Sequence, residues 1–416
     1  MKEIRVSRPK VEEVSGGMRL MCGVSDDVLP PQLWYQVSHS CSVASVLDQP
    51  NWAAVGLIYP AMALGKDLSI DAEISPCLLN FLRTDLQILL KGYDPRLHQI
   101  RVNAEESAYV SPTHSGVATG FSAGIDSFST YLLYSNSDVP SPLRLSHLSV
   151  HDVGAFGVGE QSVELYKRAC ARAEAFGKKV DKKLLFLSSN IDLFFRACGK
   201  GFEKFELSHS LRNASAAHVF HDTIHAFLYS SAYAYGDIGL RSAWNNPNLS
   251  TAYLDPILLP LLSTEKLRLI SSGAGLTRVE KTARVAESGY ADGWLDVCVL
   301  SPKKRVAFAK VNCSVCHKCV RTLATLDALG YIERFGSVFD LDSYFKNKHL
   351  LLRRLNESAL MGSALDYEVL RLWRERDLKL PRPRSSLNRR LRALLTQIDK
   401  GTRRIVRASK RRLAQL

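Results

Sequence analysis

The chain has 416 residues, of which 46% are hydrophobic, and its formal net charge is +14. It can therefore bury a sizeable core, and we expect two or three domains. No apolar run approaches the roughly 20 residues that a membrane-spanning helix needs, and the charged N-terminus lacks the apolar segment of a secretory signal. The odd number of cysteines, nine, is typical of a reducing compartment, so we predict a cytoplasmic protein.

Residues 1–110 mix strand patterns with a helical pattern and predict an N-terminal α+β module. Its Cys, His and Trp residues are spread singly, which favours places in the core over a catalytic group. A role in docking a partner or substrate is a hypothesis that rests on the position of this module alone. Strands are expected at 18–22, 33–37, 53–59 and 98–102, and a helix at 76–90.

Residues 111–330 alternate strand and helix patterns, which predicts a parallel sheet covered on both faces. Ligands of such sheets bind beyond the carboxyl ends of the strands. We expect that edge to include the loop 122–127, the turn at His151 and Asp152, and the pair Ser188 and Ser189. Further strands are expected at 145–150, 184–187 and 238–241, and helices at 162–176 and 212–235.

The segment 119–130 predicts an anion-binding loop between a buried strand ending at Ala118 and a helix whose start is expected at Phe128 to Tyr134. A turn of small residues lets backbone N–H groups approach an anion, and the helix dipole adds its positive end. Asp126 is unusual in an anion site unless it holds Mg²⁺ or orients a backbone amide. An ordinary glycine-rich turn is the alternative. The turn consists of Ser122, Gly124, Asp126 and Ser127, and the two serine hydroxyls supply further donors.

Four cysteines near the end of this region have the spacing of a metal site. A Cys-x-x-Cys turn places two sulfurs on one side of a tight loop, and two more complete a tetrahedron around Zn²⁺. We predict a closed, structural zinc knuckle. His317 could replace one thiolate, but its ring is expected to point away from the cluster. The four are Cys298, Cys313, Cys316 and Cys319. The remaining cysteines, which fit ordinary core positions, are Cys22, Cys41, Cys77, Cys170 and Cys198.

Three histidines suggest a second possible metal site. His218, His221 and His225 fall on one stripe of the helix expected at 212–235, and they could bind a metal or line a pocket. A single helix seldom supplies a whole metal site, and Asp222 is expected to face elsewhere, so core positions are favoured. His209 is the better candidate for a pocket.

Residues 331–416 are expected to form a helical extension with a basic end. From Pro381 to Leu416 there are ten Arg and two Lys against a single acid, Asp399. This tail could bind nucleic acid, an anionic protein partner or a membrane surface, or dock on the protein through its leucines. We favour docking or a protein partner and do not expect sequence-specific DNA binding. The apolar stripe of the tail comprises Leu387, Leu391, Leu394, Leu395 and Ile398.

The loop resembles the signature of the PP-loop ATP pyrophosphatase superfamily, which runs Ser-Gly-Gly-x-Asp-Ser. Five of the six positions agree, counting the free one, and Ala123 replaces the first glycine. Alanine is tolerable there only with a negative φ, so we expect that conformation at Ala123.

Together with the cysteines, this loop makes the chain similar to 7-cyano-7-deazaguanine synthase over about residues 115–330. That family carries its zinc cysteines in a similar order and an Arg-Asn pair at a helix start, matched here by Arg212 and Asn213. The chain is more similar to larger bacterial synthase-like proteins with an added N-terminal domain, some from antiphage gene clusters. Their pattern is matched at Asp255-Pro256, at Leu262-Ser-Thr-Glu265, at Thr277-Arg-Val-Glu-Lys281 and at Cys319-Val-Arg-Thr322.

The resemblance implies an enzyme that binds ATP with Mg²⁺ and cleaves it between the α and β phosphates. A small carboxylate, of the 7-deazapurine type, would accept AMP and then react with ammonia or another amine. Arg278 and Lys281 share a helix face and could reach phosphate, although ordinary ion pairs on a solvated face are equally consistent. The implied catalytic residues are Asp126, Ser127, Lys281 and Arg212, and the implied nucleotide-binding residues are Ser122, Ala123, Gly124, Ile125, Asp126, Ser127, His151 and Asp152.

Two other functions remain open. A tRNA-modifying PP-loop enzyme would use the basic tail to hold RNA, although no Cys-x-x-Cys remains free for sulfur transfer. A non-catalytic nucleotide-binding component of a defence complex would hold ATP without turnover. The chain could also form a homodimer or require a protein partner.

Overall fold

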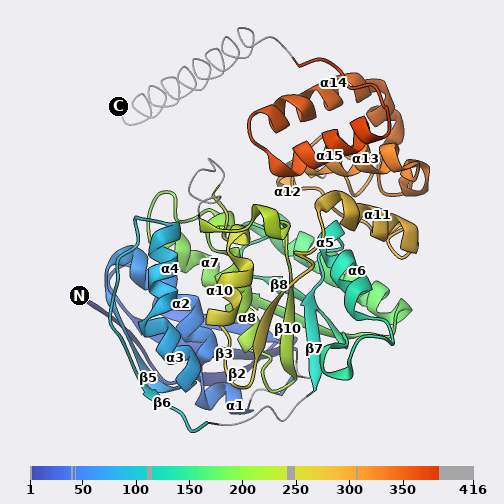
Figure 1. The fold of residues 1–416 in the computed structure, drawn as a ribbon. Coiled ribbons are helices and arrows are strands. Elements are labelled where there is room, and N and C mark those ends of the chain that lie inside the picture. The colour runs from blue at the N-terminus through green and yellow to red at the C-terminus, as the bar shows by residue number, and fades with distance from the viewer. Residues whose placement is uncertain are drawn as a thin grey trace, which may run out of the picture.

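The strands form one mixed sheet, with helices packed on both of its faces (Figure 1). Ten of the 11 strands in the described residues follow the order β11-β10-β7-β8-β9-β4-β3-β1-β5-β6, and the eleventh, β2, pairs with β3 outside this path. A computed structural model gives the structure of residues 2–38, 41–42, 44–109, 115–240, 249–305 and 308–383. The strands are β1 Glu3–Val6, β2 Lys10–Val14, β3 Gly17–Ser25, β4 Gln32–Val37, β5 Asp67–Ile74, β6 Val102–Glu106, β7 Gly116–Gly120, β8 His147–Asp152, β9 Lys183–Ser189, β10 Ile224–Ser230 and β11 Arg268–Ser272.

The half of the sheet that holds the predicted loop is parallel. Strands β11, β10, β7, β8 and β9 all run in one direction, so their carboxyl ends meet at one edge. Strand β4 then pairs antiparallel with β9, while β1, β5 and β6 form a second parallel group. The predicted α/β class with a parallel sheet is therefore confirmed in its main part, although the whole sheet is mixed.

The central parallel strands β7, β8 and β10 are largely buried on both faces, and in β7 and β10 successive side chains enter different cores. In β7, Val117 belongs to the core beneath α5 and the C-terminal helices, and Ala118 belongs to the core shared with the N-terminal region. In β10, Ala226 and Phe227 divide in the same way. These strands are therefore continuous apolar runs in the sequence rather than alternating ones.

Several helices begin and end at the signals expected from sequence. Ser75 caps the helix that starts at Pro76, because its side chain accepts a hydrogen bond from the N–H of Leu78. The helices are α1 Ala44–Asp48, α2 Asn51–Leu64, α3 Pro76–Arg83, α4 Asp85–Tyr93, α5 Ile125–Tyr134, α6 Glu160–Lys179, α7 Ile191–Ala197, α8 His209–His218, α10 Asp255–Leu261, α11 Arg278–Ser288, α12 Pro302–Arg305, α13 His317–Leu329, α14 Leu341–Leu360 and α15 Ala364–Glu375.

Two predictions for the N-terminal region are wrong in type or position. Residues 53–59 lie in helix α2, not in a strand, because this helix is apolar on every side and shows no helical period. The strand expected at 98–102 begins only at Val102. The strands predicted at 18–22 and 33–37 are confirmed within β3 and β4, and the helix at 76–90 is present as α3 and α4.

The long helix predicted at 212–235 is wrong. Helix α8 ends at His218, and strand β10 begins at Ile224, so the segment turns back into the sheet. The apolar run of β10 contains β-branched and aromatic side chains, which favour a strand although they also suit a buried helix. The strand expected at 238–241 is absent over residues 238–240, and Arg241 lies outside the described residues.

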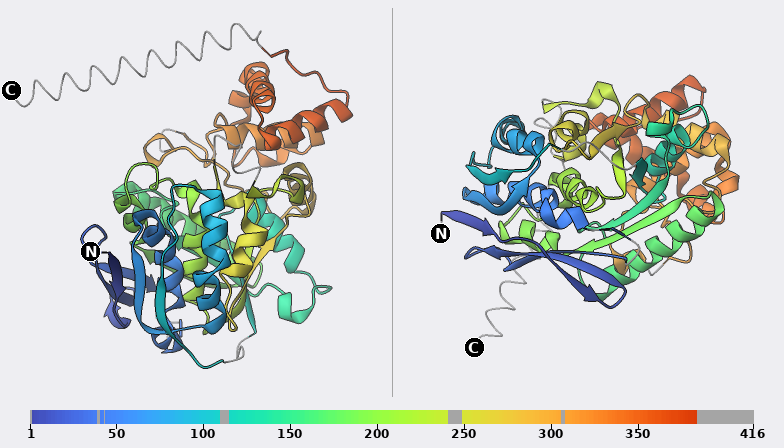
Figure 2. Two further views of the ribbon diagram at one scale, coloured as in Figure 1. Left: turned by 60° about the vertical axis from the view of Figure 1, so that its left-hand side comes forward. Right: turned by 90° about the horizontal axis from the view of Figure 1, so that it is seen from below.

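The sheet runs across the predicted boundary near residue 110. Tyr35 in β4 lies opposite Ser189 in β9, and helix α2 packs on α8 (Figure 2). The described residues before position 110 therefore share a core with residues of the parallel strands, whereas the predicted boundary itself lies outside the described residues and stays a prediction.

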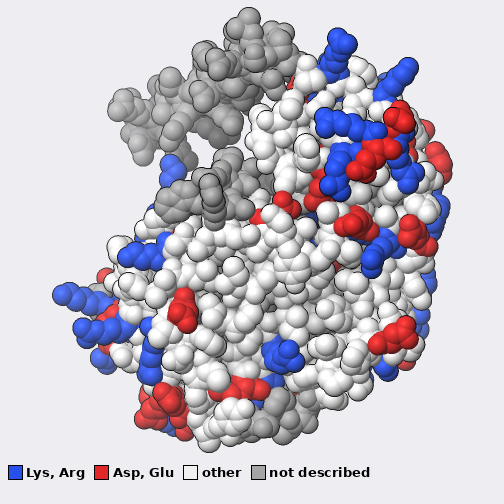
Figure 3. Space-filling view, viewed as in Figure 1, with Lys and Arg blue, Asp and Glu red and all other residues white. Residues whose placement is uncertain are grey.

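Two helices, α14 and α15, lie in the segment expected to form a helical extension, and α15 ends at Glu375. Helices α14 and α15 pack on α13, where Trp373 donates a hydrogen bond from Nε1 to the carbonyl oxygen of Ala324 (2.9 Å). Charges of both signs intermix over these helices on the face shown in Figure 3. The apolar stripe predicted from Leu387 to Ile398, and most of the basic tail that carries it, lie outside the described residues. Among the described helices, none has the length and apolarity of a membrane span.

Candidate functional site

The predicted anion-binding loop lies between β7 and α5, at the carboxyl edge of the parallel strands. Gly124 precedes the first turn of α5, and no side chain caps that turn. The N–H groups of Ile125, Asp126 and Ser127 donate no hydrogen bond to any other described residue. A helix N-terminus with unsatisfied amides and a positive dipole end favours an anion.

The expectation of a negative φ at Ala123 is wrong. This residue has φ +57°, in the left-handed region that disfavours a residue with a Cβ. The N–H of Asp296 donates to the carbonyl oxygen of Ala123 at 2.8 Å, and the Ala123 side chain is buried. Surrounding structure thus holds the loop in a strained conformation, a feature found at functional sites.

Asp126 lies opposite two cations from helix α11. Its carboxylate is 2.8 Å from Arg278 Nη2 and 3.6 Å from Lys281 Nζ. Burial lowers the pKa of Lys281, while the charge of Asp126 acts in the opposite direction. The Lys281 amino group also donates to the carbonyl oxygen of Ser231 at 2.6 Å. A cluster with two cations and one anion leaves a net positive charge beside the free amides of α5.

The other loop residues contribute in different ways. The exposed Ser122 accepts a weak hydrogen bond from the N–H of Gly124 (3.3 Å) and keeps its hydroxyl near solvent. Ser127 is buried, and its hydroxyl donates to the carbonyl oxygen of Gly124 at 2.9 Å. The Ile125 side chain is in the core, so only its backbone can contact a ligand. Nucleotide binding by these residues stays a prediction.

At the end of β8, His151 and Asp152 face opposite sides of the sheet. The His151 ring is buried between Phe220 and Phe227, and burial lowers its pKa to about 4. Asp152 is only partly buried, yet burial raises its pKa to about 6. Of the two, Asp152 is therefore better placed to meet a ligand.

Arg212 is fully buried and bonded to protein groups. Its Nη1 lies 2.6 Å from Asp192 Oδ1 and also donates to the carbonyl oxygen of Val153. A Cβ on Gly154, which has φ +107°, would come within 2.6 Å of that nitrogen. Arg212 therefore holds the turn after β8, and Nη2 is its one nitrogen without a partner among the described residues. Direct contact of Arg212 with a substrate stays a prediction.

Lys318, which no sequence pattern singled out, lies within electrostatic reach of Arg278 and Asp126. Lys318 is exposed when the whole residue is considered. Its amino group is nevertheless desolvated, and this burial, together with the charge of Arg278, lowers the pKa of Lys318. Its charge also acts on His209, whose pKa burial lowers to about 3. His209 Nδ1 bonds the hydroxyl of Tyr229 at 2.6 Å. In the sequence, the only indication of this position is that Lys318 directly precedes Cys319.

The three-histidine stripe does not exist, because its members lie on different elements. His218 Nε2 lies 2.8 Å from the carbonyl oxygen of Leu262, and His225 Nε2 lies 2.9 Å from that of Pro142. His221 contacts Asp222 at 3.5 Å, so the expectation that this aspartate faces elsewhere is wrong.

The four predicted cysteines do come together. All four sulfurs lie within 4.8 Å of one another, and these are the only such metal-ligand group among the described residues. The sulfurs of Cys313 and Cys319 are 3.8 Å apart, close to the edge of about 3.8 Å expected for a tetrahedron with Zn–S bonds of about 2.3 Å. Ser314 has φ +59°, which tightens the turn between two of the cysteines. The donor set therefore fits a closed site for a thiophilic ion such as Zn²⁺.

A direct link joins this cluster to the anion-binding loop. Asp296, whose amide holds Ala123, lies two residues before Cys298. Its carboxylate pairs with Arg305 at 2.7 Å and with Arg172 at 2.6 Å. Movement of the cysteine segment would thus be transmitted to the strained loop.

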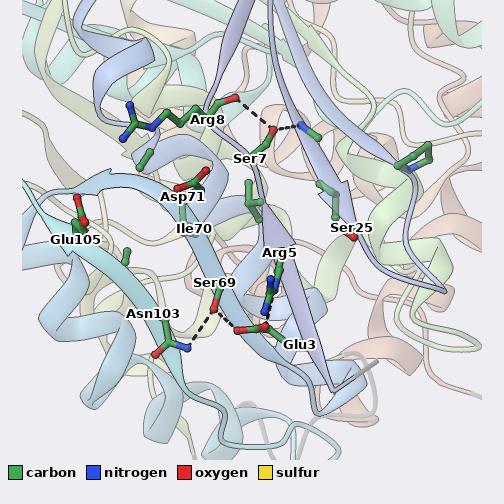
Figure 4. Close-up of a pocket in the computed structure, with 16 residues that line it drawn as sticks. Glu3, Arg5, Ser7, Arg8, Ser25, Ser69, Ile70, Asp71, Asn103 and Glu105 are labelled. Carbon is green, nitrogen blue, oxygen red and sulfur yellow. Dashed lines mark hydrogen bonds and ion pairs between the residues drawn. The ribbon is translucent and has the colours of Figure 1, made fainter.

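A separate open depression of ≈ 950 Å³ lies in the N-terminal region, among β1, β3, β5 and β6 (Figure 4). Glu3 pairs with Arg5 at 2.8 Å, and Asn103 donates to Ser69 at 3.1 Å, so these polar groups already have protein partners. None of the predicted site residues lines it.

Fold and site together define an α/β protein with a large mixed, mostly parallel sheet and a buried four-cysteine cluster after the sheet. Comparison of the chain with protein-family models, curated proteins and solved structures found no match.

Proposed function

We propose that the chain is a PP-loop enzyme that uses ATP to activate a carboxylate, releasing pyrophosphate. The observation that carries this proposal is the loop 122–127, whose free amides at the start of α5 lie beside Arg278 and Lys281. The charge and donor geometry suit a polyphosphate. The choice of a 7-deazapurine carboxylate as the substrate is taken from the sequence resemblance.

The chemistry requires charge stabilisation more than acid–base catalysis. A carboxylate oxygen of the substrate attacks the α-phosphorus, the bond to the β-phosphate oxygen breaks, and pyrophosphate leaves with the bonding electrons. Fixed cations and amides stabilise the charge that develops on the phosphate oxygens. Lys281 and Arg278 would bind these oxygens, and Lys318 could approach from the cysteine segment. Ammonia would then attack the acyl carbon and displace AMP.

The candidate site offers ligands for Mg²⁺ at Asp126, and the cysteine cluster offers ligands for Zn²⁺. Asp126 Oδ1 accepts no hydrogen bond among the described residues, so it offers one oxygen to Mg²⁺, which usually keeps several waters and phosphate ligands. Mg²⁺ would neutralise phosphate charge when bound. The four thiolates would hold Zn²⁺ in a structural site with no open position.

The test is pyrophosphate release from ATP and Mg²⁺, with and without 7-carboxy-7-deazaguanine and ammonium. Release that depends on the deazapurine would support both the reaction and the substrate class. Release with other carboxylates but not with the deazapurine would refute the substrate class alone. Absence of both ATP binding and pyrophosphate release would refute the proposed function.

A second candidate is a nucleotide-binding component that holds ATP without turnover. It is favoured by the engagement of Arg212 and His151 with protein groups, which reduces the polar atoms available to a second substrate. ATP binding without pyrophosphate release under every substrate condition would select this candidate. The tRNA-modifying alternative depends on the tail beyond residue 383, and RNA that copurifies with the protein would support it.

A further inference from the structure

The C-terminal hairpin of α14 and α15 contacts the helix that supplies the cations of the candidate site. Helix α11 lies against α5 on one side and against α13 and α15 on the other (Figure 1). The resemblance to the synthase family ends near residue 330, so it assigns no role to this hairpin. Within this contact, the carboxylate of Glu368 in α15 accepts hydrogen bonds from two backbone N–H groups at the start of α11.

Glu368 completes the N-terminal cap of α11. Within the helix, Thr277 and Glu280 form a reciprocal capping box, which satisfies the N–H of Glu280 and that of Thr277 itself. The N–H groups of Arg278 and Val279 would remain unsatisfied. Both donate to Glu368 Oε2, at 2.7 Å and 3.3 Å. A carboxylate at this end also interacts favourably with the helix dipole.

The residue whose amide Glu368 holds is the residue that reaches Asp126. Arg278 places its backbone N–H on Glu368 and its guanidinium 2.8 Å from Asp126 Oδ2. The charge of Glu368 also acts on Lys281, the second cation at Asp126. The orientation of both cations therefore depends on where α15 places this carboxylate.

The platform that carries Glu368 is firmly packed. Asp366, two residues before Glu368 in α15, pairs with Arg321 of α13 at 2.7 Å, and both side chains are buried. Trp373 anchors the other end of α15 to α13 through its indole N–H. A rigid support of this kind is what keeps a site residue within a narrow range of positions.

We propose that Glu368 is a positioning residue for the nucleotide site: it fixes the start of α11 so that Arg278 and Lys281 face Asp126. The hairpin α14–α15 is thereby part of the ATP site without touching ATP. This inference rests on the proposed function, because the effect of Glu368 on activity exists only if the Asp126 cluster binds ATP.

The experiment compares Glu368→Ala and Glu368→Gln with Glu375→Ala, a matched control on the same helix whose carboxylate pairs only with the exposed Arg371 in the described structure. Loss of a charged hydrogen bond in Glu368→Ala should raise the KM for ATP about tenfold, and Glu368→Gln, which keeps an acceptor, should show a smaller rise. Glu375→Ala should leave KM within about twofold of the wild type. A purely structural defect would lower the active fraction, and hence kcat, with KM unchanged, and that result would overturn the proposal.

Hydrogen–deuterium exchange separates this inference from the proposed function. Glu368→Ala should speed exchange in peptides covering 277–281 and 122–127, while Glu375→Ala should do neither. If the wild type does not bind ATP, the proposed function fails, and the exchange pattern still decides whether Glu368 orders both segments. Unchanged exchange in 122–127 would refute the positioning role, even with a faster rate at 277–281. If Glu368→Ala does not fold, Glu368→Gln supplies both measurements.

Discussion

At the residue scale, Asp126 decides between an anion site and an ordinary turn. Its carboxylate is the only acidic group in the loop 122–127, and it orders two cations that α11 supplies. Without its charge, Arg278 and Lys281 would repel one another and lose their common orientation.

Asp126→Asn should therefore reduce pyrophosphate release by at least about a hundredfold, because fixed electrostatic groups commonly contribute that much to catalysis. Metal content should stay the same and the protein should still fold, since the Asp126 side chain is 23% exposed and Asp126 is not one of the four cysteine positions. The comparison needs pyrophosphate release, metal analysis and thermal unfolding on the same preparation. Activity that survives the substitution would contradict the assignment of this loop.

Asp255 gives a residue-scale prediction for pH. It is fully buried, Ser210 donates to its Oδ1 at 2.6 Å, and its Oδ2 has no partner among the described residues. Burial raises its pKa to about 7, from 3.8. Between these values the unfolded chain releases a proton that the folded chain retains, so stability falls as pH rises from about 4 through about 7.

Asp255→Asn removes this titration, so its stability relative to the wild type should increase by about 1–3 kcal/mol between pH 4.5 and pH 8. Urea unfolding of both proteins at several pH values measures the difference, in which the other titrating groups cancel. A difference that is constant across this range would show that Asp255 titrates normally.

At the element scale, segments with a distinctive residue pattern were predicted correctly, and segments without one were not. The β7–α5 unit and the cysteine segment were predicted because Gly, Ser and Cys at fixed spacings have few structural uses. Helix α2 was misassigned because an apolar segment buried on all sides has neither a helical nor a strand period. Arg278 and Lys281 were named from the sequence as site candidates because they share a helix face. Lys318 and Glu368 could not be named, because their place near the site depends on how α13 and α15 pack.

The cysteine segment yields a prediction of its own. We expect the wild-type protein to contain one Zn²⁺ per chain. Cys316→Ser, or removal of the metal with a chelator, should eliminate this zinc and lower the unfolding temperature, because a structural zinc contributes to folding free energy. ATP affinity should fall as well, since the segment holds Ala123 through Asp296. Elemental analysis, thermal unfolding and nucleotide binding test the three effects.

Cys77→Ser is the matched control, because Cys77 is exposed and lies outside the cluster. It should keep its metal, its unfolding temperature and its ATP affinity. If Cys316→Ser behaves in the same way, the cluster is not a structural metal site.

At the scale of the whole molecule, the N-terminal region and the predicted ATP domain share one sheet and one core. Ser215 of α8 bonds the hydroxyl of Tyr35 at 2.6 Å and the carbonyl oxygen of Trp52 at 2.6 Å, all within the buried interior. The sequence could not show this, because a turn-rich boundary near residue 110 is also what a loop within one domain produces. The N-terminal region therefore has a structural role irrespective of any partner.

A chain that begins at residue 115 should consequently fail to fold. It would lose the pairing of β4 with β9, and it would expose the face of α8 that α2 covers. We expect the fragment to be insoluble, and we expect the intact described core to unfold in a single transition seen by both calorimetry and tryptophan fluorescence. Coexpression of residues 1–109 should rescue solubility, because it restores the missing strand and helix. A soluble fragment that retains its metal and unfolds cooperatively would show instead that the N-terminal region is an independent domain that only docks on the sheet.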